Sequence, residues 1–203
     1  MSKIFEFRPG SYIDLVSGAV GVNTNGEWAR TEKGLAWRGN GSEYVTYDHL
    51  TTLPEDFSIV CWFKRSETST DDKSPFGSLG TNLQAFRIRD NIWSYYIIDN
   101  NGNITTNTLH DIDDTEWHCA ILTFDYDGVT TGYLDGVQGD EVNSNSDTYI
   151  DISEIRVGLS GVSDYFNGDV SYAAIYDHIL TEKEISKLYG EFLRASPVTR
   201  VVE

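Results

Sequence analysis

The sequence has little of several residue types, and each shortage excludes a class of protein. Its 203 residues include only two cysteines and one methionine. Two cysteines cannot build a disulfide framework, and the absence of a CxxC motif or a Cys/His cluster argues against a zinc site. No apolar run reaches the ~18 residues that a transmembrane helix needs, so we expect no membrane insertion.

Basic residues are also scarce: 15 Lys and Arg stand against 32 Asp and Glu, for a formal net charge of −17. Binding to a polyanion needs clustered Lys and Arg, so nucleic acid and bare anionic membranes are excluded as favoured partners. Residues 90–155 contain no Lys or Arg but 14 acidic residues, whereas residues 1–89 and 156–203 are nearly balanced. We expect the loops of this window either to hold a cation or to form a negative surface for a partner.

Residues 1–7 alternate like a β-strand and lack the continuous apolar stretch of a secretory signal. We therefore expect synthesis and retention in a cytoplasm, unless an upstream segment has been removed. Cys61 and Cys119 fall within alternating segments and are interpreted as buried thiols, with their redox state open.

Apolar and polar residues alternate with a period of two along much of the chain, which predicts an antiparallel all-β domain. Residues 57–64 and 117–124 show the pattern most clearly. Asp127-Gly128 and Asp135-Gly136 are tight-turn signals around a short strand at 129–134, because a type I′ turn needs positive φ at both central residues. We read residues 1–203 as a single domain.

One segment, residues 181–192, has helical spacing of its apolar residues. Thr181 and Glu184 have the spacing of a capping box, in which each side chain satisfies the backbone N–H of the other. We expect this helix to pack on the sandwich by its apolar stripe, which consists of Ile185, Leu188, Tyr189 and Phe192.

Five motifs occur in an order that is specific in combination. They are FSIVCWFK (57–64), TEWHCAILTFDYDG (115–128), GYLDGVQ (132–138), IRVG (155–158) and FNGDVSYAAIYDHILTEKEISKLY (166–189). Together they resemble the laminin-G-like, concanavalin A-like jelly rolls. The chain departs from that family at Cys119, where a second histidine is usual, and at Ser171, where an acid is usual. Residues 1–56 fit only loosely, and either complete the sandwich or form a neighbour-binding arm.

The resemblance implies a two-sheet jelly-roll sandwich with one short C-terminal helix, used mostly to bind glycans or proteins and frequently carrying a rim calcium. Laminarinase-type hydrolases share the fold, and the segment 111–116 superficially imitates their alternating carboxylate motif. Its first residue is Asp111, whose side chain is too short to place the nucleophilic carboxylate correctly. The segment also directly precedes the Trp117-His118 strand, where those hydrolases have a loop. We therefore expect a non-enzymatic domain, with glycoside hydrolysis as the least favoured alternative.

Sugar binding needs an aromatic face beside planar polar groups, and residues 84–96 offer both. A two-residue turn at Asp90-Asn91 would pair Arg89 with Ile92, Ile88 with Trp93, Arg87 with Ser94 and Phe86 with Tyr95. The face with Trp93 then belongs to the core. The opposite face carries the predicted ligand-binding residues, which are Arg87, Arg89 and Tyr96.

A calcium site would use oxygen ligands from loops. Asp99 lies in one polar loop, and Asp111, Asp113 and Asp114 lie in another. Neither loop has the EF-hand register, so a site would combine residues distant in sequence. We predict that Ca²⁺, if bound, uses some of these four aspartates.

These observations lead to one leading hypothesis and two main alternatives. The leading one is an adhesion or decoration module of a bacteriophage virion, on capsid or tail, that contacts a host-surface glycan or protein. The first alternative is a purely structural virion subunit that binds neighbouring virion proteins. The second is a carbohydrate-binding module of a secreted, extracellular bacterial protein.

Overall fold

The computed structural model describes residues 2–68, 71–78, 83–144, 150–152, 154–161 and 163–195. Within these ranges the secondary structure consists of β-strands and one helix, and the paired strands are antiparallel. The predicted all-β jelly-roll sandwich with a C-terminal helix is confirmed.

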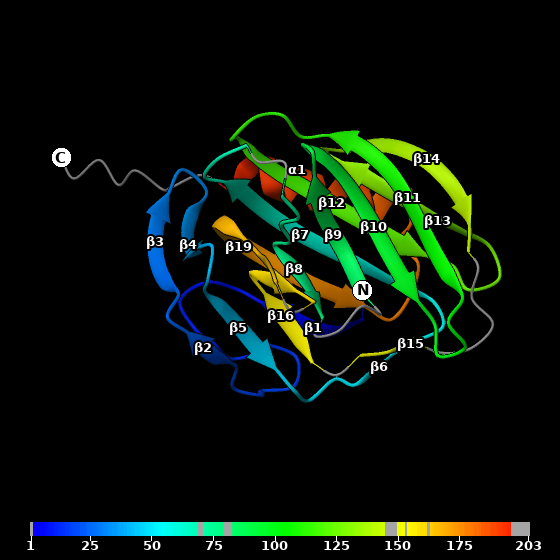
Figure 1. The fold of residues 1–203 in the computed structure, drawn as a ribbon, viewed down its shortest axis with the longest axis horizontal. Coiled ribbons are helices and arrows are strands. Elements are labelled where there is room, and N and C mark those ends of the chain that lie inside the picture. Colours follow the sequence, from blue (N-terminus) through cyan, green and yellow to red (C-terminus); the bar gives the residue numbers. More distant parts are fainter. Residues whose placement is uncertain are drawn as a thin grey trace.

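The larger sheet forms the back layer in Figure 1. Its strand order is β14-β13-β12-β7-β19-β4-β3, and β1 pairs with the second half of β19. Its strands are β1 (Lys3–Phe7), β3 (Glu27–Thr31), β4 (Gly34–Asn40), β7 (Phe57–Arg65), β12 (Trp117–Phe124), β13 (Val129–Leu134), β14 (Val137–Asn143) and β19 (Asn167–Tyr176). β1, β3 and β4 come from the loosely matching N-terminal residues, which therefore help to complete the sandwich.

The front layer consists of two smaller sheets that lie side by side where β8 meets β9 (Figure 1). One has the order β11-β10-β9, with β9 (Leu83–Arg89), β10 (Ile92–Ile98) and β11 (Ile104–Asp111). The other has the order β2-β5-β16-β8, with β2 (Val22–Thr24), β5 (Tyr44–Tyr47), β8 (Phe76–Ser78) and β16 (Ile155–Val157). Two short pairs complete the fold: β6 (Thr52–Leu53) with β15 (Ile150–Asp151), and β17 (Leu159–Ser160) with β18 (Asp164–Tyr165).

Helix α1 (Glu182–Arg194) covers the face of the large sheet that points away from the front layer (Figure 1). The predicted capping box is present, with Thr181 as N-cap and Glu184 as its partner. Ile185, Leu188 and Phe192 are buried beneath the helix, so the predicted stripe does pack on the sandwich. None of the helical residues described is part of a segment long and apolar enough to cross a membrane.

The central strands of the large sheet are covered on both faces, which explains why β7 and β12 are almost continuously buried. Cys61 points into the core between the two layers, whereas Cys119, on the neighbouring strand, points into the smaller core beneath α1. Both cysteines are free thiols and lie on opposite faces of one sheet, so they cannot bond to each other. The interpretation as buried thiols is confirmed.

The two tight-turn signals have different outcomes. Asp135 and Gly136 have φ of 51° and 80°, as a type I′ turn requires. Asp127 and Gly128 do not have positive φ, so this turn is not of type I′, although the chain does turn here and β13 follows at Val129–Leu134 as predicted. The chain instead reverses over four residues, and the Gly128 amide donates a hydrogen bond to the Asp125 carbonyl at 3.4 Å.

Candidate functional site

The predicted ligand-binding residues lie on the β9–β10 hairpin. Its turn residues Asp90 and Asn91 have φ of 51° and 62°, and Asx residues are among the few that tolerate this conformation. The register pairs Arg89 with Ile92, Ile88 with Trp93 and Arg87 with Ser94, as predicted. The turn chemistry therefore determines which side chains of β9 face outward near the tip of the hairpin.

Farther from the turn, the predicted pairing of Phe86 with Tyr95 was wrong. The register shifts between Ser94 and Tyr96, so that Tyr96 pairs with Gln84. β9 contributes one residue more than β10 across this irregularity, and both Ala85 and Phe86 are buried as a result. The face that carries Phe86, Trp93 and Tyr95 nevertheless lies in the core, as expected.

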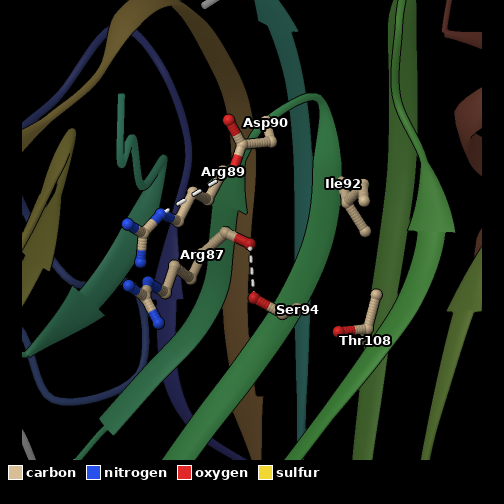
Figure 2. Close-up of a pocket in the computed structure, with 6 residues that line it drawn as sticks. All are labelled: Arg87, Arg89, Asp90, Ile92, Ser94 and Thr108. Atoms are coloured by element: carbon tan, nitrogen blue, oxygen red, sulfur yellow. Dashed lines mark hydrogen bonds and ion pairs between the residues drawn. The ribbon is translucent and has the colours of Figure 1, made fainter. Parts of the chain in front are cut away.

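Arg87 and Arg89 extend side by side from the outer face of β9 (Figure 2). Asp72 binds both: its carboxylate lies 2.8 Å from Arg87 Nη2 and 3.6 Å from Arg89 Nε. Lys73 brings Asp72 to this place, because it forms two backbone hydrogen bonds with Ile88 of β9. The hydrogen bond to Asp72 also raises the pKa of the Arg87 guanidinium. Asp72 is a residue of this site that the sequence did not reveal.

A hollow of about 210 Å³ lies beside the two arginines on the outer face of the hairpin. Figure 2 shows the guanidinium groups on one side of it and Ile92 and Thr108 on the other. Tyr96 is half-buried and is not among the six lining residues, but it follows Ser94 on the same face of β10. The structure therefore brings Arg87 and Arg89 together and places Tyr96 next to the hollow. The lining residues are Arg87, Arg89, Asp90, Ile92, Ser94 and Thr108.

Arg65 fixes the hairpin from behind. Its buried guanidinium donates hydrogen bonds to Asn91 Oδ1 at 3.1 Å, to the Ile112 carbonyl, and to the Asp114 carbonyl at 3.1 Å. The end of β7, the hairpin turn and the 112–114 loop are thus joined through one side chain. Sequence analysis missed this residue, because a basic residue at the end of a strand ordinarily points to solvent.

The four predicted calcium ligands do not come together. Asp99 follows the last residue of β10, whereas Asp111 at the end of β11 pairs with Ile92, the first residue of β10. The full length of β10 therefore separates the two aspartates. The buried Asp99 carboxylate accepts hydrogen bonds from the backbone amides of Asn101 and Asn103, at 2.9 and 2.8 Å, and so stabilises its own loop.

Asp111 and Asp113 are exposed, and Asp114 accepts hydrogen bonds from the Glu116 amide and from His118. Within the described ranges, no three His, Cys, Asp or Glu side chains gather closely enough to hold a metal ion. Calcium binding stays a prediction.

His118 lies between two carboxylates. Its Nδ1 is 2.7 Å from Asp135 Oδ2 and its Nε2 is 2.9 Å from Asp114 Oδ1, while the other Asp135 oxygen accepts from the Cys119 amide. Burial lowers the pKa of His118, but the hydrogen bonds to the two aspartates outweigh burial and leave the pKa raised. The imidazole thus joins the 112–116 loop to the Asp135 turn and has a structural role.

Residues 38–186 match the family described as the concanavalin A-like lectin/glucanases superfamily. The chain belongs to this superfamily, as its motifs had indicated. No curated protein sequence matches the chain significantly.

Several solved structures have the same fold at low sequence identity. The binding domain of Paraclostridial Mosquitocidal Protein 1 has a TM-score of 0.79 at 17% identity, over 94% of this chain and 52% of that one. The botulinum neurotoxin serotype D ligand-binding domain, solved with N-acetylneuraminic acid, has a TM-score of 0.74 at 16% identity, over 93% and 50%. The present chain thus spans about half the length of these toxin domains.

A third similar structure matches over nearly its whole length. Domain 4 of AbnA, an extracellular GH43 arabinanase from Geobacillus stearothermophilus, was solved with arabinotriose. Its TM-score is 0.68 at 16% identity, over 93% of this chain and 98% of that one. At such identities the likeness establishes the fold alone.

Proposed function

We propose that this chain is a non-enzymatic glycan-binding domain and that the outer face of the β9–β10 hairpin is its ligand site. The observation that carries the proposal is the pair of guanidinium groups held by Asp72 beside a hollow, with Tyr96 next to it. Similar domains have been solved with arabinotriose and with N-acetylneuraminic acid, which supports a saccharide as the ligand.

The chemistry of the site suits a sugar. Guanidinium groups present several N–H donors in a fixed plane, and carboxylates accept hydrogen bonds, so together they match the alternating hydroxyls of a sugar ring. Tyr96 and Ile92 offer apolar surface to its C–H face. Because Asp72 and the rigid turn hold the two arginines, a ligand meets donors that are already in position, which reduces the entropy lost on binding.

The surroundings of the carboxylates at 111–116 support binding rather than hydrolysis. Asp114 is already hydrogen-bonded to His118, and Asp111 and Asp113 project from the end of a strand and from a loop. A retaining hydrolase needs two carboxyl groups ~5–5.5 Å apart across a sugar. The two toxin structures named above are also binding domains.

A narrower form of the proposal places this domain on a bacteriophage virion, where it would engage the host surface. It rests on the sequence alone, since none of the three similar structures described is a virion protein. A purely structural virion subunit, or a module of a secreted bacterial protein, would have the same fold. Detection of this chain in purified phage particles, or in a bacterial secretome, separates these sources.

The proposal is tested on a glycan microarray that includes arabinotriose and N-acetylneuraminic acid, with and without millimolar calcium. We expect the R87K/R89K variant to lose at least tenfold in affinity for the glycan that wild type binds, because lysine keeps the charge but loses the planar fork. The control is Arg30→Lys, which makes the same change at an exposed position of β3 in the other layer.

Two results would count against the proposal in different ways. Unchanged affinity in a folded R87K/R89K variant would show that the ligand does not bind at this hairpin. A wild-type protein that binds no glycan under either calcium condition would remove the function and favour the structural alternative.

A further inference from the structure

A second and larger hollow, of about 500 Å³, lies on the outer surface of the other front sheet. Its floor is a row of side chains on paired strands, since Thr46 of β5 pairs with Val22 of β2 on one side and with Arg156 of β16 on the other. Its volume falls within the ~300–1,000 Å³ typical of small-molecule sites. The lining residues are Val20, Val22, Thr24, Tyr44, Thr46, Asp48, Glu154 and Arg156.

The polar end of this hollow is organised around Arg156. Arg156 Nε donates a hydrogen bond to Glu154 at 2.5 Å, and its Nη1 donates to the Gly161 carbonyl at 2.9 Å. Its guanidinium also lies 5.1 Å from the centroid of the Tyr44 ring. Arg156 and Glu154 are thus bound to each other, so Asp48 and the threonine hydroxyls are the lining groups that we expect a ligand to contact.

The other end of the hollow is apolar and exposed. Val20 and Val22 expose 72% and 68% of their surface. Val22 lies on β2, and the preceding loop is held in place because Val20 pairs with Ile13 and the buried Asp14 carboxylate accepts hydrogen bonds from the amides of Val16 and Ser17. Exposed apolar residues on a fixed frame next to polar groups are typical of a binding surface rather than of an ordinary solvent face.

Strand β18 has contacts on the side of each hollow. At one end the Asp164 carbonyl accepts a hydrogen bond from the amide of Ser74, two residues after Asp72, whose carboxylate binds Arg87 of the first hollow. The next residue, Tyr165, has its ring centroid 6.1 Å from that of Tyr44 in the second hollow. The two residues of β18 thus connect the segment that holds Arg87 with Tyr44 of the second hollow.

We propose that the second hollow is a further glycan-contacting subsite, and that one extended, uncharged polysaccharide chain occupies both hollows. This inference rests on the proposed function of the first hollow. Sugar rings have an apolar C–H face and a hydroxyl edge, which match the valines at one end and the Asp48–Glu154 end at the other. An uncharged chain fits better than a polyanion, because the protein carries a net charge of −17 and these two acids line the hollow. Contact at two points raises affinity for long chains without affecting short ones.

The test uses a microarray on which uncharged glycans, and sulfated counterparts as a comparison, are printed as ladders from disaccharide to octasaccharide. We expect Val22→Asp to lower affinity for hexasaccharides and longer chains at least tenfold and to leave disaccharides within twofold. Thr46→Trp, which fills the same hollow, should have the same length dependence. Val137→Asp is the matched control, since Val137 is 62% exposed on β14 of the other layer.

The outcomes separate this inference from the proposed function. If Val22→Asp and Thr46→Trp both match Val137→Asp at every length, or if wild-type affinity does not rise with chain length, the second subsite is overturned while glycan binding stands. Binding confined to the sulfated ladders would overturn the uncharged class of ligand. If wild type binds no glycan of any length, the proposed function and this inference fall together.

Discussion

Replacing His118 by leucine removes the imidazole that joins Asp114 to Asp135 and leaves both carboxylates without their ring partner. Hydrogen bonds to charged groups contribute about 1.5–3 kcal/mol each. His118 is only 7% exposed, but the side chains of Asp114 and Asp135 are 49% and 31% exposed, so solvent screens part of that energy. We expect a net loss of about 2–3 kcal/mol at pH 5.5. For a chain of this length, that is a fall in Tm of about 4–12 °C.

The loss should depend on pH in a defined direction. The folded protein binds the His118 proton more tightly than the unfolded chain does, because the folded pKa is raised. The stability that this provides is fully present below the unfolded pKa of about 6.5, and it disappears as the pH rises through the folded pKa. The difference between wild type and His118→Leu should therefore be larger at pH 5.5 than at pH 9.

Urea unfolding followed by tryptophan fluorescence at both pH values measures this difference. His178→Leu is the control, since His178 is a partly exposed histidine that pairs with Asp177 at the start of the C-terminal helix. A His118→Leu variant as stable as wild type at pH 5.5, or a stability difference that is equal at the two pH values, would refute the reasoning.

Two further predictions concern buried groups. The Asp14 carboxylate accepts three backbone amide hydrogen bonds and lies 2.9 Å from His49 Nε2. Asp14→Ala should therefore lower the free energy of unfolding, measured in urea, by about 3 kcal/mol. A loss below about 1 kcal/mol would contradict this. Cys61 and Cys119 are buried, and burial raises the pKa of both thiols. Neither should therefore react with Ellman's reagent in the native protein at pH 7.5, whereas both should react in guanidinium. Rapid labelling of the native protein would contradict this.

Much of the fold could be predicted because its signals are local. The alternation at 57–64 predicted a strand, and the spacing of Thr181 and Glu184 predicted the start of the helix. The turn at Asp90-Asn91 also predicted which face of its hairpin points outward. In each case, neighbouring residues determine the conformation through backbone geometry, capping or burial on one face.

The missing parts depend on contacts between segments distant in sequence. Asp72 reaches the arginines because a segment 15 residues before Arg87 adds to the edge of β9, and no local pattern encodes this. Arg65 similarly meets a carbonyl group 47 residues away. Asp99 was interpreted as a possible metal ligand, although it hydrogen-bonds to its own loop, because a carboxylate in an Asn-rich loop suits both roles equally.

The position of β19 within the large sheet has a consequence for how the protein folds during synthesis. β19 pairs with β7, more than 100 residues earlier in the chain, and with β4 and β1, which lie earlier still. Until residues 167–176 leave the ribosome, the apolar strand β7 lacks one neighbour and has an unpaired edge. Such long-range pairing is slow, and the waiting chain can pair with other molecules in the meantime. Chains truncated before β19 should therefore aggregate rather than form a smaller soluble domain.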